Sequence, residues 1–101
     1  MASMIASTEL IVIVDGREAP VTAAIGLPYE SDMGEWRCPV SLQGLHEDLS
    51  DVAGEDALQA LCLAATLLRN LLQNVRARGG QLLDANRSEY SIEATFGRVG
   101  V

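Results

Sequence analysis

The sequence predicts an α+β fold in which one long helix packs on one face of an antiparallel sheet. Three observations predict it: apolar runs with the period of a strand fill the first half of the chain, Asp15-Gly16 separates two of them, and a helical apolar period extends over Gly54–Arg78. The expected order is β-β-β-α-β, with room for one extra short strand after the helix. A length of 101 residues fits one domain, residues 1–101.

The first two strands are expected to form a hairpin. Thr8–Val14 is rich in β-branched and aliphatic side chains, and Asp15-Gly16 directly after it is a strong hairpin signal. Apolar side chains then alternate with others along Ala19–Leu27. Pro20 lies on the opposite parity, and its missing N–H favours an edge strand or a bulge nearby.

Three further segments are expected to be strands. Trp36–Gln43 alternates apolar and polar side chains, which is typical of a strand with one wet face. A short strand is expected at Gln81–Leu83, after the helix. Tyr90–Phe96 alternates in the same way and is the strand predicted to end the fold.

The helix is predicted over Gly54–Arg78, with Glu55 and Asp56 in its first turn and Gly79-Gly80 as its stop. At 1.5 Å per residue it extends about 37 Å, whereas a strand of about seven residues spans about 23 Å. We therefore expect the helix to overhang the sheet unless loops or another chain cover its ends. The face expected to pack on the sheet carries Leu58, Leu61, Cys62, Ala65, Leu68, Leu72 and Val75.

The charge balance is acidic, with fourteen Asp and Glu, seven Arg, no Lys and a net charge of -7. Such a surface repels phosphate backbones and anionic lipids, which disfavours binding to nucleic acid and to membranes. It favours a basic protein partner, whose approach long-range attraction would accelerate. The alternative is that the charge serves solubility alone.

Eight carboxylates lie in two segments that flank the third strand and the start of the helix. If the strands bring both segments to one end of the molecule, these side chains form a docking surface for a basic partner; the alternative is a solvated face. The eight residues are Glu30, Asp32, Glu35, Glu47, Asp48, Asp51, Glu55 and Asp56.

The helix offers a second candidate surface. Ala57, Ala60 and Ala64 form a stripe of small residues beside Leu67 and Leu71, which makes the apolar sector of the helix wide. A contact between two copies of the chain would explain this width, and so would burial on both sides within one domain.

The sequence offers no constellation that catalysis requires. His46 is the only histidine, and Cys38 and Cys62 are both expected on apolar faces as buried free thiols. His46 and the acidic residues Glu47, Asp48 and Asp51 do not match the spacing of a zinc site or a calcium loop. We therefore expect no catalytic residue, no metal and no cofactor, with an enzyme built on the His46 loop as a minor alternative.

Three sequence pieces carry a resemblance. Glu35–Pro39 (Glu-Trp-Arg-Cys-Pro), Gly44-Leu45 and Gly54–Leu61 (Gly-Glu-Asp-Ala-Leu-Gln-Ala-Leu) resemble the signature of a family of short, uncharacterised bacterial proteins. The resemblance covers roughly Glu9 to Leu83. The family implies no activity, so no catalytic residue is transferred.

No targeting or membrane segment is expected. Met1–Ile5 has no basic region and no long apolar stretch, and the apolar-rich run Ala57–Leu68 is shorter than the ~20 residues that a membrane span requires. We therefore expect a cytoplasmic protein. The first hypothesis is a small inhibitor, in the manner of an immunity protein that neutralises a bacterial toxin; the alternative is a homodimeric structural or regulatory module that associates through the helix.

Overall fold

The computed structural model describes residues 3–97, so Met1 and Ala2 of the segment assessed for a signal peptide lie outside the described residues. Within that range the strands pair in a four-stranded sheet of order β5-β2-β1-β7 and a three-stranded sheet of order β3-β4-β6, and every pair is antiparallel. The predicted α+β class is confirmed. The elements are β1 (Met4–Val14), β2 (Arg17–Gly26), β3 (Tyr29–Glu30), β4 (Trp36–Cys38), β5 (Val40–Gln43), β6 (Val52–Gly54), α1 (Ala57–Ala77), β7 (Gln81–Asp84) and α2 (Ile92–Phe96).

The β1–β2 hairpin forms where the sequence predicts it. Asp15 and Gly16 have φ angles of 52° and 77°. Positive φ at both central residues is the requirement of the tight turn that matches the twist of the two strands, and glycine adopts it without a Cβ to resist. The resulting register sets Leu10 opposite Val21, and both side chains are buried.

Pro20 does not make β2 an edge strand, as the sequence suggests, because β2 lies between β1 and β5. The β5 ladder covers only Thr22–Ile25 of β2. Pro20 therefore lies beyond the end of that ladder, where no β5 partner requires the N–H that proline lacks.

The strand predicted at Trp36–Gln43 is divided at Pro39. Proline cannot donate to a ladder, and its carbonyl accepts the N–H of Gly26 at 2.8 Å. Before Pro39 the chain forms β4, in the centre of the three-stranded sheet; after it the chain forms β5, at the edge of the four-stranded sheet. The chain thus changes sheets at a residue that cannot continue a regular ladder.

Helix α1 starts after Asp56, whose carboxylate accepts the backbone N–H of Gln59 at 2.7 Å and caps the helix. The prediction that the helix starts at Gly54 is wrong because Gly54 ends β6. The N–H of Gly80 bonds to the carbonyl of Val75 at 2.9 Å, so the glycine pair ends the helix as expected.

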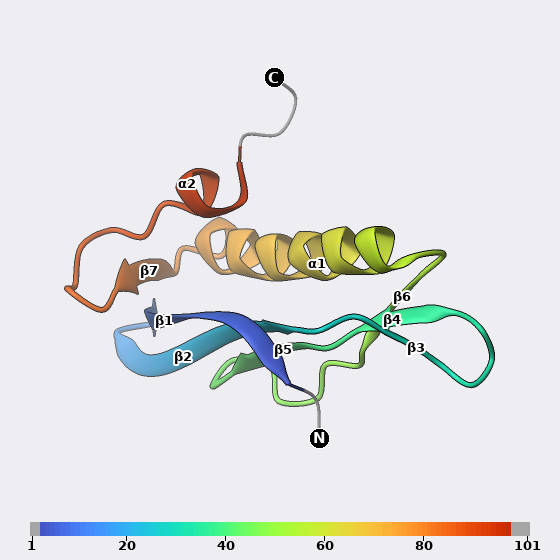
Figure 1. The fold of residues 1–101 in the computed structure, drawn as a ribbon. Coiled ribbons are helices and arrows are strands. Elements are labelled where there is room, and N and C mark those ends of the chain that lie inside the picture. The colour runs from blue at the N-terminus through green and yellow to red at the C-terminus, as the bar shows by residue number, and fades with distance from the viewer. Residues whose placement is uncertain (1–2, 98–101) are drawn as a thin grey trace.

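Helix α1 lies across one face of both sheets (Figure 1). Its first half contacts β4 and β6, and its second half contacts β7 and α2. At 1.5 Å per residue its length is about 32 Å. The overhang expected from the sequence is filled by the three-stranded sheet, which extends the floor under the first half of the helix.

The buried face of α1 differs from the predicted one. Leu58 is 70% exposed and Cys62 is also exposed, so the prediction that these two side chains pack on the sheet is wrong. At 100° per residue, the buried face is rotated about 60° around the helix axis from the expected one. The buried side chains are Ala60, Ala64, Leu68, Leu72 and Val75.

The rotation follows from a close contact between α1 and β6. A Cβ atom on Gly54 would lie 2.5 Å from the backbone nitrogen of Ala60, which is closer than real Cβ contacts occur. At this separation only a small side chain fits between helix and strand. Ala60 and Ala64, both 0% exposed, take the inner positions, and Leu58, Cys62 and Leu63 are turned outward.

The strand predicted at Tyr90–Phe96 is wrong, because this segment contains α2. The segment bonds to the edge of β7 only where it begins: the N–H of Tyr90 donates to the carbonyl of Leu82 at 2.9 Å. Ser91 then caps the helix. Side chains four residues apart share a face in a strand and also in a helix. Ile92 and Phe96 therefore lie on one face in either structure, and in α2 this face packs against the core.

The core lies between α1 and the sheets, and β7, which confirms the strand predicted at Gln81–Leu83, completes one edge of it. Trp36 is half-buried against this core. In the described residues the buried cluster consists of Leu10, Val12, Val21, Ala23, Cys38, Val40, Leu42, Ala60, Ala64, Leu68, Leu72, Val75, Leu82, Tyr90 and Ile92.

The orientation of α1 predicts opposite outcomes for two neighbouring substitutions. Ala64→Leu should lower the free energy of unfolding by about 1–3 kcal/mol, because the added carbons have no space. Cys62→Leu, on the exposed side, should change it by less than about 0.5 kcal/mol. Urea denaturation of both variants measures the difference, and a larger loss for Cys62→Leu would contradict the orientation.

Candidate functional site

The three-stranded sheet holds six of the eight predicted surface carboxylates around one end of the molecule. Strand β4 pairs with β3 on one side and β6 on the other. Trp36 pairs with Gly54, so the β3–β4 loop lies beside the segment after β6, although the two are distant in the sequence. Asp51, before β6, is joined to β3 by a hydrogen bond from the Tyr29 hydroxyl. We call this region the acidic end; its residues are Glu30, Asp32, Glu35, Asp51, Glu55 and Asp56.

Glu47 and Asp48 do not complete a single patch of eight. The carboxylate of Glu47 accepts the backbone N–H of Gly44 at 2.8 Å, just after β5. From Glu35 to Gly44 the extended β4–β5 segment spans up to about 30 Å. Glu47 is thus held at the far end of this segment, and Asp48 lies in the loop that returns from there to β6.

Several of these carboxylates have partners within the chain. Glu35 accepts the Nε–H of Arg37 at 2.8 Å, Asp51 accepts the hydroxyl of Tyr29 at 2.5 Å, and Asp56 caps α1. These three are parts of the fold. Removing them would change stability as well as surface charge.

Other carboxylates have no such role. Glu30, Asp32, Asp48 and Glu55 are all exposed. Among residues 3–97 none of the four carboxylates takes part in a hydrogen bond or an ion pair. Their negative charge is therefore free to act on a partner.

Tyr29 in β3 lies directly opposite Arg37 in β4. Tyr29 donates to Asp51 and Arg37 donates to Glu35, so each of the two side chains holds one carboxylate of the acidic end. The hydrogen bond to Asp51 raises the pKa of Tyr29 above its ordinary value, because ionisation of the phenol would remove the donated proton and place two negative charges together. The Tyr29–Asp51 bond also ties β3 to the residue before β6.

The β3–β4 loop forms a shallow hollow of about 490 Å³. Three carboxylates and one guanidinium line it, which leaves its walls negative. Met33, 89% exposed, lies at this loop. A hollow with this charge suits the end of a Lys or Arg side chain. Its lining residues are Tyr29, Glu30, Ser31, Asp32, Met33, Glu35 and Arg37.

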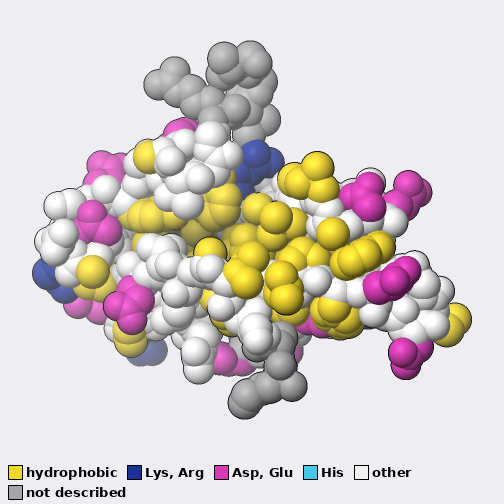
Figure 2. Space-filling view, viewed as in Figure 1, with side chains coloured by type: hydrophobic (Ala, Val, Ile, Leu, Met, Phe, Trp, Pro, Cys, Tyr) yellow, Lys and Arg dark blue, Asp and Glu magenta, His cyan; other side chains and the backbone are white. Residues whose placement is uncertain are grey.

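Hydrophobic side chains extend over α1 toward the acidic end, between two groups of acidic side chains (Figure 2). In the first half of α1 the outward side carries Leu58 and Cys62, both exposed, and Leu61 and Ala65, both half-buried. We call these four residues the α1 apolar band. Sequence reasoning missed the exposure of Leu58 and Cys62 because it assigned all four side chains to the core, whereas Leu61 does pack against the core as predicted.

The homodimer face predicted on α1 does not form as expected. Ala60 and Ala64 are 0% exposed, so they cannot contact a second chain. Ala57, Leu67 and Leu71 are half-buried, and the two leucines pack against the core. The width of the apolar sector on this side is therefore explained by burial within the domain.

The two cysteines occupy different environments. Cys38 is buried, its thiol donates to the carbonyl of Gly26 at 3.4 Å, and burial followed by the charge of Asp51 raises its pKa. A thiol in this setting is a poor nucleophile. Cys62 is exposed, so the expectation that both thiols are buried is wrong for this residue.

Among residues 3–97 the side chain of His46, the predicted alternative site, makes no hydrogen bond or ion pair. The side chain is exposed, and its backbone N–H bonds to the carbonyl of Leu42 at 2.8 Å. Within residues 3–97, no three His, Cys, Asp or Glu side chains are grouped so that they could hold a metal ion. The same range contains no helix with the length and apolarity needed to cross a bilayer.

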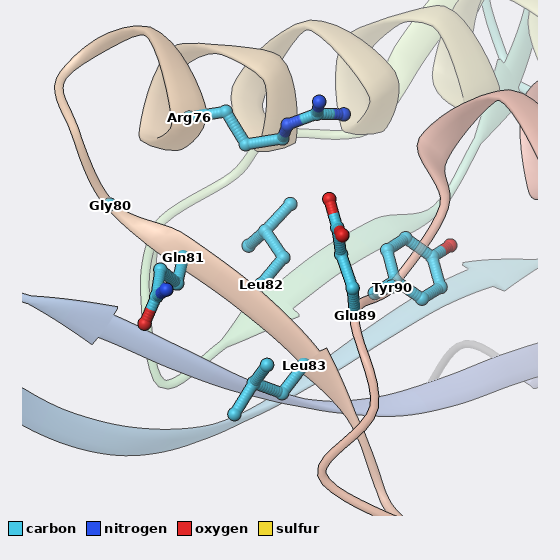
Figure 3. A pocket seen from close by; sticks show the side chains of 7 residues that line it. All are labelled: Arg76, Gly80, Gln81, Leu82, Leu83, Glu89 and Tyr90. Atoms are coloured by element: carbon cyan, nitrogen blue, oxygen red, sulfur yellow. The ribbon is translucent and has the colours of Figure 1, made fainter.

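A second hollow, of about 210 Å³, lies between the end of α1 and β7 (Figure 3). Arg76 and Glu89 both line it, and the carboxylate of Glu89 points toward the Arg76 side chain. Arg76 also meets Glu93 at 3.9 Å. The hollow is smaller than the ~300 Å³ at which ligand pockets begin, and its charges oppose one another. It is therefore a poor candidate for a ligand site.

Comparison with known proteins gives a family. A family model described as Domain of unknown function (DUF6968) matches residues 6–95. No curated protein and no solved structure matches the chain. The description assigns no activity, so the roles of the residues rest on their geometry and charge.

The Tyr29–Asp51 bond predicts a pH effect. Tyr29 should titrate above the ordinary tyrosine value of about 10, and Asp51→Asn should lower its titration midpoint toward that value. Since the folded pKa is raised, the bond stabilises the fold below the unfolded pKa, and this stabilisation disappears as pH rises through the folded pKa. Tyrosinate absorbance measures the titration, with Tyr29→Phe as the reference from which the Tyr29 signal is obtained by difference. Identical midpoints with and without Asp51 would contradict the bond.

Proposed function

We propose that the chain, which belongs to the family described as Domain of unknown function (DUF6968), is a non-enzymatic protein that binds and inhibits a basic partner protein. More specifically, the proposal is that the chain acts as an immunity protein that neutralises a bacterial toxin. The acidic end is the binding surface, and the cytoplasm is the compartment in which it acts.

The observation that carries the proposal is the hollow of the β3–β4 loop. Its walls hold three carboxylates against one guanidinium, and that guanidinium is already paired with Glu35. Glu30 and Asp32 remain free of partners in the described chain. A Lys or Arg side chain of a partner protein would find both charge and space there. Its desolvation would cost little free energy, because the hollow stays open to water at its rim.

The apolar side chains around the hollow support a protein partner rather than a small cation. Met33 is 89% exposed, and Tyr29 is exposed beside it. Met and Tyr are enriched at protein interfaces, where an apolar centre is surrounded by a polar rim. An exposed Met between carboxylates has this arrangement and contributes nothing to the core of the chain.

The charge supports inhibition of a protein that itself acts on an anionic substrate. An enzyme that acts on nucleic acid binds phosphates through a basic surface. A negative surface that covers those basic residues competes with the substrate. Long-range attraction would also make association fast, which suits a protein that must capture its target soon after synthesis.

Site-specific photocrosslinking in the source cells tests the proposal. A photoreactive amino acid at Met33 should give one discrete adduct with a basic protein. The same amino acid at Gln73, an exposed position in the second half of α1, is the control and should not give that adduct. Adducts that are identical at both positions, or an adduct of the chain with itself alone, would overturn the proposal.

The partner identified in this way allows a quantitative test. Glu30→Gln, Asp32→Asn and Glu55→Gln together should lower the association rate constant about tenfold at low salt. The control Glu9→Gln, Asp15→Asn and Glu89→Gln removes the same charge elsewhere and should have a much smaller effect. Equal effects of the two sets would mean that only the net charge matters, which contradicts a specific surface at the acidic end.

A further inference from the structure

The first half of β1 is a strand edge without a neighbour. On one side β1 pairs with β2 from Met4 to Val14, whereas on the other side β7 pairs only with Leu10–Ile13. Within residues 3–97 no element pairs with that other side over Met4–Glu9. This segment is the deep blue end of β1 in Figure 1, and β7 lies beside the opposite end of the strand.

The backbone of this segment directs hydrogen-bonding groups into solvent. Leu82 and Asp84 of β7 form backbone bonds on the side away from β1, so the residue between them is the one that bonds to Ile11. Every second residue of a strand directs its N–H and C=O to the same side. Ser7 and Glu9 therefore present both groups on the side of β7, beyond the end of β7. An edge of this kind accepts an extended chain, which continues the ladder.

The side chains of this edge carry few of the features that protect edge strands in native proteins. Lys, Pro and inward-pointing charges are common protections, and Ser3–Thr8 contains no charged residue and no proline. Met4 and Ile5 are 45% and 54% exposed. One protection is present, a bulge at Ile5, which bends the strand and limits the regular open stretch to Ala6–Glu9. The edge therefore suits a short strand.

From the open edge we infer that two copies of the chain pair antiparallel through the first halves of their β1 strands, about a two-fold axis at Ser7. The two Ser7 residues exchange their N–H and C=O groups. Thr8 lies opposite Ala6 of the second copy, and Glu9 lies opposite Ile5. The two four-stranded sheets thereby become one continuous sheet. This contact is separate from the acidic end and does not rest on the proposed function.

Strand β7 sets this register. Asp84 occupies the position beside Leu10, so the strand of the second copy has to end opposite Glu9. With Ser7 at the axis, the residue opposite Glu9 is Ile5, which is the point where the bulge bends the chain away from its straight course. A register shifted toward Leu10 would drive the second strand into β7.

Charge and preorganisation favour a second copy over a strand from a basic partner protein. Glu9 is the one charged residue in the paired segment, so the edge offers little attraction to Lys or Arg. In the proposed register the two Glu9 side chains lie about 14 Å apart along the strands, beyond the ~8 Å over which salt leaves charges unscreened. The second copy also supplies a strand that is already formed, whereas a flexible segment would lose conformational entropy on pairing.

The small size of the contact predicts a weak dimer. About five residues of each chain pair, against the ~20–30 residues a side of a standard interface, and each copy carries a net charge of -7. Salt screens the repulsion between the copies. Dimerisation should therefore strengthen with added salt, whereas binding of a basic partner at the acidic end should weaken. The salt dependence separates failure of this inference from failure of the proposed function.

Ser7→Pro tests the pairing and leaves the β1–β2 ladder in place. Proline removes the N–H of Ser7, which faces away from β2, so each copy loses one hydrogen bond of the contact. Sedimentation equilibrium should show a monomer–dimer equilibrium for the native chain, and Ser7→Pro should raise its dissociation constant about tenfold or more. Ser7→Ala is the matched control, because it keeps the backbone N–H and should change the dissociation constant little.

Hydrogen exchange provides a measurement that needs no variant. The amides of Ser7 and Glu9 should exchange fast in dilute solution and slowly in concentrated solution, while that of Asp32, in the β3–β4 loop, should not depend on concentration. A chain that stays monomeric at millimolar concentration, with both amides exchanging fast, overturns the inference. A dimer that Ser7→Pro leaves intact forms through another surface and overturns it too. Protection of these amides by a bound partner protein alone would assign the edge to that partner, and the inference fails.

Discussion

The distance between α1 and β6 is the constraint on which the rest of the structure depends. Gly54 has no Cβ, and one placed there would lie 2.5 Å from the backbone of Ala60. The helix can lie this close only with alanines on its inner side, so its first half is packed through Ala60 and Ala64. Everything on the opposite side, above all Leu58 and Cys62, is consequently turned to solvent.

The same contact explains why the charged and apolar surfaces occur together. Strand β6 is hydrogen-bonded to β4, and β4 to β3, so the strand that holds the helix close also brings the β3–β4 loop to its start. Free carboxylates of that loop and Glu55 are therefore adjacent to the exposed leucine side of α1.

The sequence predicts the parts of this fold that are governed by local rules. Asp15-Gly16 readily takes the positive φ angles that the observed hairpin turn requires, and the glycine pair after Arg78 ends the helix as expected. What the sequence does not contain is the distance between elements. The rotation of α1 depends on the approach of Gly54 to Ala60, and the division at Pro39 depends on a second sheet for β4 to join. The period of Tyr90–Phe96 fits strand and helix alike, and the occupied edge of β7 decides between them. For the site, the sequence identifies the free acidic residues but not the apolar side chains beside them, because a leucine on a helix predicts burial unless the packing distance is known.

The reactivity of the two thiols tests the orientation of α1 most directly. In the native chain a thiol reagent such as DTNB should modify Cys62 rapidly, and Cys38 only after unfolding, because one lies on the open side of α1 and the other is buried with a raised pKa. Cys62→Ser should then abolish the native reaction. If neither thiol reacts in the native chain, or if Cys38 reacts as fast as Cys62, α1 does not present Leu58 and Cys62 to solvent, and the account of the interaction surface is wrong.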